Sequence, residues 1–246
     1  LWVSTENSGY YLINENNEID QHFTFDPLSP LSISSSNFLD ANKNKIILSD
    51  TLNVFIATQN GFNVYNRKLK TFRRYFKGDQ SKFSTNLIVG VQCFKNKILI
   101  ASENEVVTFN PESSSFEKIF STDKKINSFI SIDNKVPPIL STNNQDYKLL
   151  FDDDKFSFDL MANKIILPNQ KIAKTNTNLM FWENGSSSYI QTDLDLSNKQ
   201  VFDLGFSINS LSAGIRDIVF IGTNNGVKTL NNKEKYVNNI RNFNSS

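Results

Sequence analysis

The fold of this chain is decided by one stretch of sequence, Val54-Phe55-Ile56-Ala57-Thr58-Gln59-Asn60-Gly61-Phe62-Asn63-Val64-Tyr65. Its first part, Val54 to Ile56, is a run of β-branched and aromatic residues, and Phe62 to Tyr65 resumes that composition. Asn-Gly between two apolar runs is the strongest local signal of a β-hairpin, because both residues tolerate positive φ. We therefore expect a strand, a tight turn at Gln59-Asn60-Gly61 and a second strand.

The same pattern returns along the chain at a spacing of about 40 residues. Each copy has a large apolar residue, a small residue and a hydroxyl residue, followed by a polar turn and a second apolar strand. The copies are Val3-Ser4-Thr5, Ile56-Ala57-Thr58, Ile100-Ala101-Ser102, Leu140-Ser141-Thr142 and Ile221-Gly222-Thr223, with a degraded copy at Phe181-Trp182-Glu183. A charged strand follows each copy, and an apolar segment such as Ser84 to Val89 precedes several of them. Each unit is therefore predicted to hold four strands.

Four-stranded units at this spacing indicate an all-β chain and a β-propeller, in which stacked blades cover each other's faces. We predict one propeller domain over residues 1–246 with about six blades, which either close a ring or form part of a seven-bladed one. The repeat units lie near 1–25, 37–83, 84–123, 124–160, 161–204 and 205–246. The inner strands at Val54 to Ile56 and Ile218 to Ile221 read as continuous apolar runs, so we expect both of their faces to be covered.

The first spacing is longer than the others because an insertion falls between Asp26 and Leu52. Pro27, Pro30 and a run of serines predict a loop there, and an extra hairpin at Lys45 to Leu48 is the alternative. The chain starts inside a strand signal and without an initiator Met, so we interpret it as a piece of a longer protein. No apolar run reaches the roughly 18 residues of a membrane helix, and we expect no direct membrane insertion of this segment.

Composition disfavours several classes of function. The 26 Lys and Arg residues nearly balance 25 Asp and Glu residues, whereas a nucleic-acid-binding domain normally carries a basic excess. Cys93 is the single cysteine and His22 the single histidine, which leaves no internal disulfide and no cysteine-based zinc site. We expect His22 to be an ordinary exposed strand residue and Cys93 a buried, unreactive one. The sequence predicts no metal and no cofactor.

Several charged and aromatic residues of the chain are candidate sites. Six cations stand close together at Arg67, Lys68, Lys70, Arg73, Arg74 and Lys77. They predict either a patch for an anionic sugar or acidic partner, or, as we favour, an outer hairpin whose edge is protected by charge. Asp152-Asp153-Asp154 fits a hairpin turn better than a calcium loop, because calcium ligands alternate along the chain. Trp2 and Trp182 occupy strong β positions, so core packing is favoured over sugar stacking.

The residues Leu1 to Asn7, Val54 to Tyr65 and Phe220 to Val227 resemble the repeat of the two-component-regulator propeller family. The connector Phe25 to Asn37, with its Asp-Pro start and its serines, also resembles that of the family. The similarity is strong in the first, second and sixth units and weak in the fourth and fifth. It implies a periplasmic sensor domain of a Bacteroidetes hybrid two-component system, in a parent that carries a membrane helix and a histidine kinase.

The resemblance further implies a homodimeric parent and recognition of an oligosaccharide. We accordingly expect a non-catalytic, ligand-sensing propeller whose ligand-binding residues are unknown from sequence, with no catalytic residue assigned. The alternative is a structural or protein-docking propeller of a bacterial surface or secretion component. A glycan-cleaving enzyme is a third hypothesis, which would need two carboxylates about 5 to 10 Å apart in an open axial pocket. The non-repeating residues of turns and loops are where recognition is expected.

Overall fold

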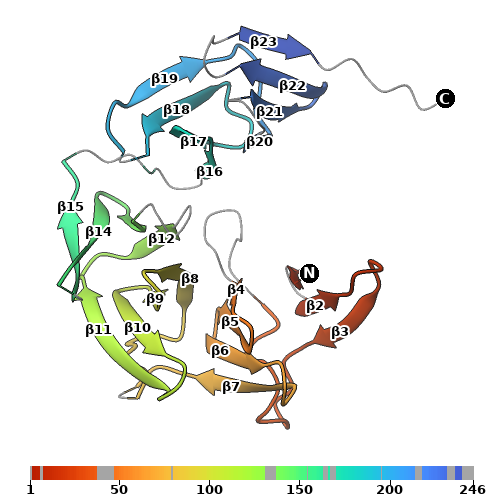
Figure 1. The fold of residues 1–246 in the computed structure, drawn as a ribbon, viewed down its shortest axis with the longest axis vertical. Coiled ribbons are helices and arrows are strands. Elements are labelled where there is room, and N and C mark those ends of the chain that lie inside the picture. The colour runs from red at the N-terminus through yellow and green to blue at the C-terminus, as the bar shows by residue number, and fades with distance from the viewer. Residues whose placement is uncertain are drawn as a thin grey trace. The chain divides into compact units, whose positions relative to one another are not determined.

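The structure is a computed structural model that describes residues 2–5, 8–37, 47–78, 80–130, 137–153, 155–162, 166, 170–194, 196–213, 218–231 and 236–239. Over these residues the chain forms strands and turns and no helix (Figure 1). The strands build six antiparallel sheets, and within each sheet they are ordered as in the chain. This confirms the expectation of an all-β chain made of short repeated sheets.

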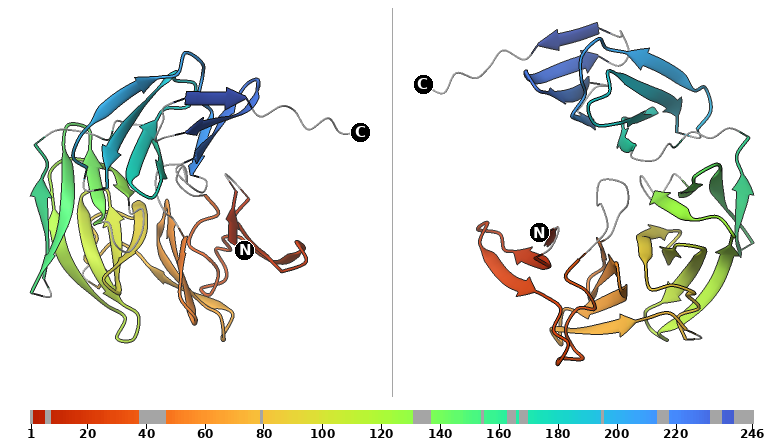
Figure 2. Two further views of the ribbon diagram at one scale, coloured as in Figure 1. Left: turned by 45° about the horizontal axis from the view of Figure 1, so that its top comes forward. Right: turned by 180° about the vertical axis from the view of Figure 1, so that it is seen from behind.

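The chain divides into two compact units, residues 1–165 and residues 166–246. The first unit holds four sheets, of which the first has three strands and the others four. They are β1 (Trp2–Ser4), β2 (Tyr10–Ile13) and β3 (Ile19–Phe23); β4 (Ile47–Ser49), β5 (Asn53–Thr58), β6 (Gly61–Asn66) and β7 (Thr71–Tyr75); β8 (Ile88–Phe94), β9 (Lys97–Ser102), β10 (Glu105–Asn110) and β11 (Ser115–Ser121); and β12 (Ile126–Ile130), β13 (Ile139–Thr142), β14 (Asp146–Asp152) and β15 (Lys155–Leu160). In both views of Figure 2 these four sheets follow one another in chain order.

The second unit holds two four-stranded sheets. They are β16 (Lys171–Lys174), β17 (Asn178–Trp182), β18 (Ser188–Asp193) and β19 (Gln200–Asp203); and β20 (Ser210–Ala213), β21 (Ile218–Thr223), β22 (Gly226–Asn231) and β23 (Tyr236–Asn239). A core of buried residues from both sheets, including Met180, Trp182, Val219 and Ile221, joins them.

The repeated hydroxyl residue closes the turn between the second and third strands of the four-stranded sheets, and the turn between β1 and β2 in the first sheet. Thr58 Oγ1 donates to the carbonyl oxygen of Gly61 at 2.9 Å and accepts the backbone N–H of Asn60 at 3.2 Å. Equivalent bonds from the hydroxyl to the carbonyl that ends the turn occur at Thr5, Ser102, Thr142 and Thr223. The hydroxyl thus provides a hydrogen-bond partner for a backbone carbonyl at the point where the hydrogen bonds between the two strands end. This explains why every clear copy of the motif ends in Ser or Thr.

The decisive hairpin forms as expected, but its turn ends one residue earlier than predicted. Thr58 pairs with Gly61, so Gln59 and Asn60 are the two turn residues and Gly61 begins β6. Gly61 adopts φ of 110°, and a Cβ at this position would lie 2.7 Å from the carbonyl oxygen of Tyr75. The glycine is therefore required by a close approach of β7 as well as by its backbone conformation.

Neighbouring sheets of the first unit stack face to face through apolar side chains. Val54 and Ile56 pack with Tyr10 of the preceding sheet, while Phe55 and Phe62 pack with side chains of the following one. Leu99, Ala101 and Val106 on the other face of the β8–β11 sheet pack against the β12–β15 sheet. Because β5 is buried on both faces, its continuous apolar composition is accounted for.

The prediction that both faces of Ile218 to Ile221 are covered is wrong. In β21 burial alternates, and the Phe220 side chain is 42% exposed. Within its unit this sheet stacks against one other sheet, which covers a single face, so alternate side chains face outward.

The insertion forms a loop that covers the outer edge of β7. The backbone N–H of Phe72 donates to Leu31 O at 3.1 Å, and Arg74 donates to the carbonyl oxygens of Ser29 and Ser32. The strand at Ile47 pairs with β5 and is the leading strand of the second sheet, so the described part of the proposed hairpin at Lys45 to Leu48 belongs to that sheet. Residues 38–46 lie outside the described residues. The number of blades, ring closure and unit boundaries stay predictions.

Candidate functional site

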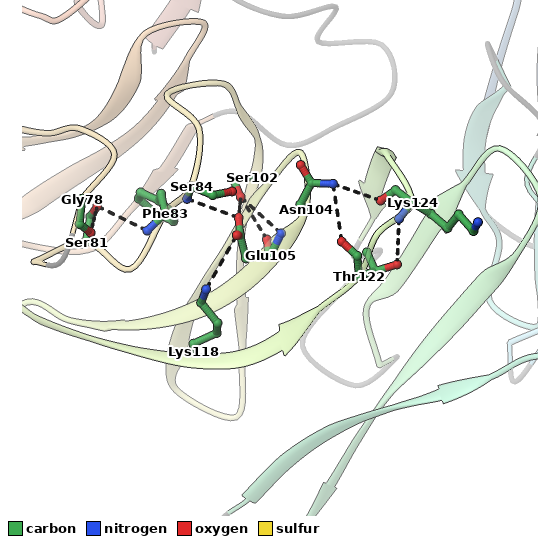
Figure 3. Close-up of polar contacts among 10 residues, drawn as sticks. All are labelled: Gly78, Ser81, Phe83, Ser84, Ser102, Asn104, Glu105, Lys118, Thr122 and Lys124. Atoms are coloured by element: carbon green, nitrogen blue, oxygen red, sulfur yellow. Dashed lines mark hydrogen bonds and ion pairs between the residues drawn. The ribbon is translucent and has the colours of Figure 1, made fainter.

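A buried carboxylate lies at the start of β10 (Figure 3). Glu105 is 5% exposed, and its Oε2 accepts from Ser102 Oγ at 2.7 Å and from the backbone N–H of Ser84 at 3.5 Å. Lys118 Nζ lies 3.6 Å from Oε1. Burial raises the pKa of Glu105, but the bonds from Ser84 and Ser102 and the charge of Lys118 together hold that pKa below its ordinary value. Both carboxylate oxygens of Glu105 have partners, so its side chain connects the segment that holds Ser84 to the β8–β11 sheet.

A second buried polar cluster joins the insertion to β6. Asn63 is fully buried; its Oδ1 accepts the backbone N–H of Ser34 at 2.9 Å and its Nδ2 donates to Ser34 Oγ at 2.8 Å. Ser34 Oγ and Thr58 Oγ1 are 3.0 Å apart. The donors and acceptors of this cluster satisfy one another, which makes it a structural element that fixes the insertion.

The six clustered cations do not gather into one patch. Arg74 holds the insertion loop, and Arg73 Nη1 donates to Ser114 Oγ of the next sheet at 2.8 Å. Arg67, Lys68 and Lys70 remain exposed on the turn between β6 and β7, and Lys77 is exposed just after β7. Alternation along β7 sends neighbouring side chains to opposite faces, which separates Arg73 from Arg74.

The other sequence candidates occupy structural positions. Asp152 ends β14 and pairs with Lys155, with Asp153 in the turn at φ of 44°; Asp154 lies outside the described residues. No group of three or more metal-ligating side chains occurs over the part of the chain that is described. His22 is exposed on β3, where it stacks on Tyr11 with ring centroids 4.1 Å apart and contacts Ser8 O through Nε2 at 2.6 Å.

The two tryptophans pack against apolar cores, Trp182 as a buried residue and Trp2 as a partly buried one. Trp182 is 4% exposed within the core of the second unit, and Trp2 stacks on Phe23 with ring centroids 5.2 Å apart. Both rings pack against apolar neighbours, and Trp182 also lines a small hollow of the second unit. Their Nε1 groups have no hydrogen-bond acceptor among the described residues. Cys93, on β8, is partly exposed rather than buried, so the expectation of a buried residue is wrong.

A hollow of about 440 Å³ lies on the β8–β11 sheet in the first unit. Its walls include Lys97 of β9, Thr108 and Asn110 of β10, and Ser115 and Glu117 of β11. The turn between β10 and β11 adds Pro111 and Glu112. The volume falls within the roughly 300 to 1,000 Å³ of typical ligand sites.

The polar side chains of this hollow share one face of the sheet. Thr108 pairs with Glu117, and Asn110 with Ser115. Residues directly opposite each other, and residues two apart on a strand, lie on the same face. Lys97 joins them, because it lies two residues before Leu99, which pairs with Thr108. Sequence inspection missed this set, because cross-strand neighbours become visible only once the register is known.

A smaller hollow of about 240 Å³ lies in the second unit on the β16–β19 sheet. Phe181, Ile190 and Val201 form a cross-strand row in its wall, together with Ser186 and Ser188. Its lining is more apolar than that of the first hollow.

Comparison with known proteins finds similar folds among solved structures. No family model matches the chain, and no curated protein matches its sequence. Among solved structures, the extracellular domain of the hybrid two-component system BT3049 from B. thetaiotaomicron is similar, with a TM-score of 0.65 and 14% identity, over 94% of this chain and 32% of that one. The extracellular domain of BT4673 from the same organism gives a TM-score of 0.59 and 14% identity, over 93% of this chain and 30% of that one.

A third similar structure is U3-55K, with a TM-score of 0.60 and 11% identity over 93% of this chain and 72% of that one. The chain spans about a third of the length of the two extracellular domains. At these identities the likeness concerns the fold, which this chain shares with the extracellular domains of hybrid two-component systems. Over the described residues, no helix is long and apolar enough to cross a membrane.

Proposed function

We propose that this chain is part of the periplasmic, ligand-sensing propeller of a hybrid two-component sensor histidine kinase, and that its ligand is an oligosaccharide. The observation that carries the proposal is the fold shared with two extracellular domains of such systems over 93% and 94% of the chain. The repeat at Val54 to Tyr65, which resembles that of the sensor family, supports it independently.

In this proposal the repeated strands are a rigid support and the non-repeating side chains bind the ligand. Ligand binding at one surface of the propeller stabilises one arrangement of a homodimeric parent over another, and the membrane helix transmits that preference to the kinase. The parent, its other domains and a Bacteroidetes source are parts of the proposal.

Two measurements test the proposal. Sequencing the native gene beyond this segment should reveal a membrane helix and a kinase domain; a secretion-sorting or anchoring tail in their place would favour the docking alternative. Isothermal titration calorimetry of the 246-residue chain against an oligosaccharide panel should detect binding. Absence of binding to every member contradicts the choice of ligand.

The role is proposed to be binding without catalysis. Incubating the chain with each bound oligosaccharide and measuring newly formed reducing ends should give no increase over buffer. Release of reducing ends would instead support the glycan-cleaving hypothesis, since the hollow on the β8–β11 sheet contains two carboxylates, Glu112 and Glu117.

The docking alternative has one observation in its favour. Leu52 and Leu69 are 61% and 69% exposed on adjacent turns, which are joined by the bond from Arg67 N–H to Leu52 O at 2.9 Å. Large exposed apolar patches mark contact surfaces, and under the docking alternative these two leucines belong to such a patch. If docking is the function, the variant Leu52→Ser/Leu69→Ser should lose a partner that co-purifies with the native parent, while glycan binding by the wild type should be absent.

A further inference from the structure

We propose that the hollow on β9, β10 and β11 is the oligosaccharide-binding site of this segment and that it accepts neutral rather than acidic sugars. This inference rests on the proposed function and adds the site and the ligand class to it. Its starting point is the face of the β8–β11 sheet that carries Lys97, Thr108 and Glu117.

The polar composition of this face begins where the hollow begins. Further along the same face, Leu99, Ala101 and Val106 are fully buried against the next sheet. Two residues beyond Val106 on the same strand, Thr108 is partly exposed and lines the hollow. A face that is otherwise apolar thus changes to hydroxyl, ammonium and carboxylate groups at the hollow.

The preceding sheet carries an apolar residue at the position of Thr108. Aligned on the turn hydroxyls Thr58 and Ser102, the row Leu99–Thr108–Glu117 corresponds to Phe55–Val64–Arg73. Val64 packs against the apolar core, and Arg73 binds Ser114. The repeat therefore accommodates an apolar residue at the position of Thr108 without loss of fold, so the hydroxyl there is not demanded by the architecture.

The polar side chains in the hollow can form further hydrogen bonds with a ligand. Within the described part of the chain, the side chains of Lys97, Thr108 and Glu117 have no hydrogen bond or ion pair. Asn110 Oδ1 accepts the backbone N–H of Glu112 at 2.9 Å, which orients its amide nitrogen as a donor. Donors and acceptors on adjacent strands, about 4.8 Å apart, match a ligand with hydroxyl groups along its length.

The charge of the hollow selects between sugar classes. Its lining holds one cation, Lys97, and two carboxylates, Glu112 and Glu117. Carboxylate or sulfate groups on a ligand would face a net negative surface, and like charges at contact are costly. The exposed cations Arg67, Lys68 and Lys70 are on the turn of another sheet and do not line this hollow. Neutral oligosaccharides are therefore favoured.

The test is calorimetric titration of the 246-residue chain and its variants. The neutral probes are cello-, xylo-, manno- and malto-oligosaccharides of three to six units, and the acidic probes are oligogalacturonates and chondroitin sulfate disaccharides. We expect wild type to bind a neutral probe, and the variants Thr108→Val and Glu117→Gln each to lower its affinity at least tenfold. Both replacements conserve shape at positions that are not buried, and a melting curve checks that each variant folds.

The matched control is Asp159→Asn. Asp159 pairs with Lys148, which pairs with Ile139, and this row corresponds in the next sheet to the row that contains Glu117. The control should bind like wild type. Equal affinity of Thr108→Val, Glu117→Gln and wild type for a bound glycan overturns this site while leaving the sensor proposal intact. Binding of acidic probes alone overturns the ligand class, and binding of none overturns the site together with the oligosaccharide proposal.

Discussion

The replacement Phe62→Ala tests whether the stacking of sheets stabilises the first unit. The Phe62 side chain is fully buried, and its ring centroid lies 5.3 Å from Phe109, 6.3 Å from Phe116 and 5.9 Å from Tyr75. It therefore joins the β4–β7 and β8–β11 sheets in one aromatic cluster.

The expected loss follows from that burial. Truncation of a buried Phe to Ala costs about 3 to 5 kcal/mol, the upper part of which applies where a rigid neighbourhood cannot collapse into the cavity. Three close aromatic neighbours on two stacked sheets make collapse difficult, so we expect about 4 kcal/mol. For a unit of this size, each kcal/mol corresponds to roughly 2 to 4 °C, which predicts a decrease in Tm of about 10 °C.

The assay is differential scanning calorimetry, and Phe220→Ala is the control. Phe220 is also on an inner strand, β21, but it is 42% exposed and should cost less than about 1.5 kcal/mol. Equal destabilisation by the two replacements, or a decrease below about 3 °C for Phe62→Ala, would refute the idea that stacked aromatic side chains hold the first two four-stranded sheets together.

Three further changes have defined outcomes. The pKa of Glu105 is below its ordinary 4.5, so ionised Glu105 stabilises the fold above that pH, and this stability is lost as the pH falls through the folded-state pKa. Glu105→Gln should therefore lower the free energy of unfolding by about 1 to 3 kcal/mol at pH 7 and flatten the acid side of a plot of stability against pH. An unchanged pH profile would contradict this. Gly61→Ala should lower the free energy of unfolding, measured by denaturant titration, by more than about 1 kcal/mol, because its Cβ would meet Tyr75 O; a neutral result would mean that the hairpin relaxes easily. Arg74→Met should speed limited proteolysis within residues 26–33, whereas a Lys68→Met control should not.

Local patterns predicted the strands well. The Asn-Gly signal located the hairpin between Val54 and Tyr65, and the recurring hydroxyl marked the end of a strand in each clear copy. These features depend on interactions between residues within one turn of each other, so the local sequence is enough to predict most of them. The one-residue error in the turn arose because the glycine is needed against β7, a contact that no local pattern reveals.

Features that depend on which surfaces meet could not be predicted. Phe220 belongs to an apolar run like that of β5, yet it is exposed, since coverage is decided by the neighbouring sheet and not by composition. The cations near Arg73 lie close together in sequence, but only the register of β7 shows that Arg73 and Arg74 lie on opposite faces of the sheet. The hollow brings together residues up to 20 positions apart, from Lys97 to Glu117, and required the register of three strands.

The turn hydroxyls have a consequence for how the chain folds. The hairpin at each clear copy of the motif closes with a bond between residues three or four apart, and the strands of each sheet pair with their immediate neighbours in sequence. Loop closure therefore costs little entropy at any step, and the contact order of each sheet is low for an all-β chain. Hairpins can nucleate independently and grow by adding the next one, so a chain emerging from the ribosome should acquire structure from its N-terminal end in increments of one sheet.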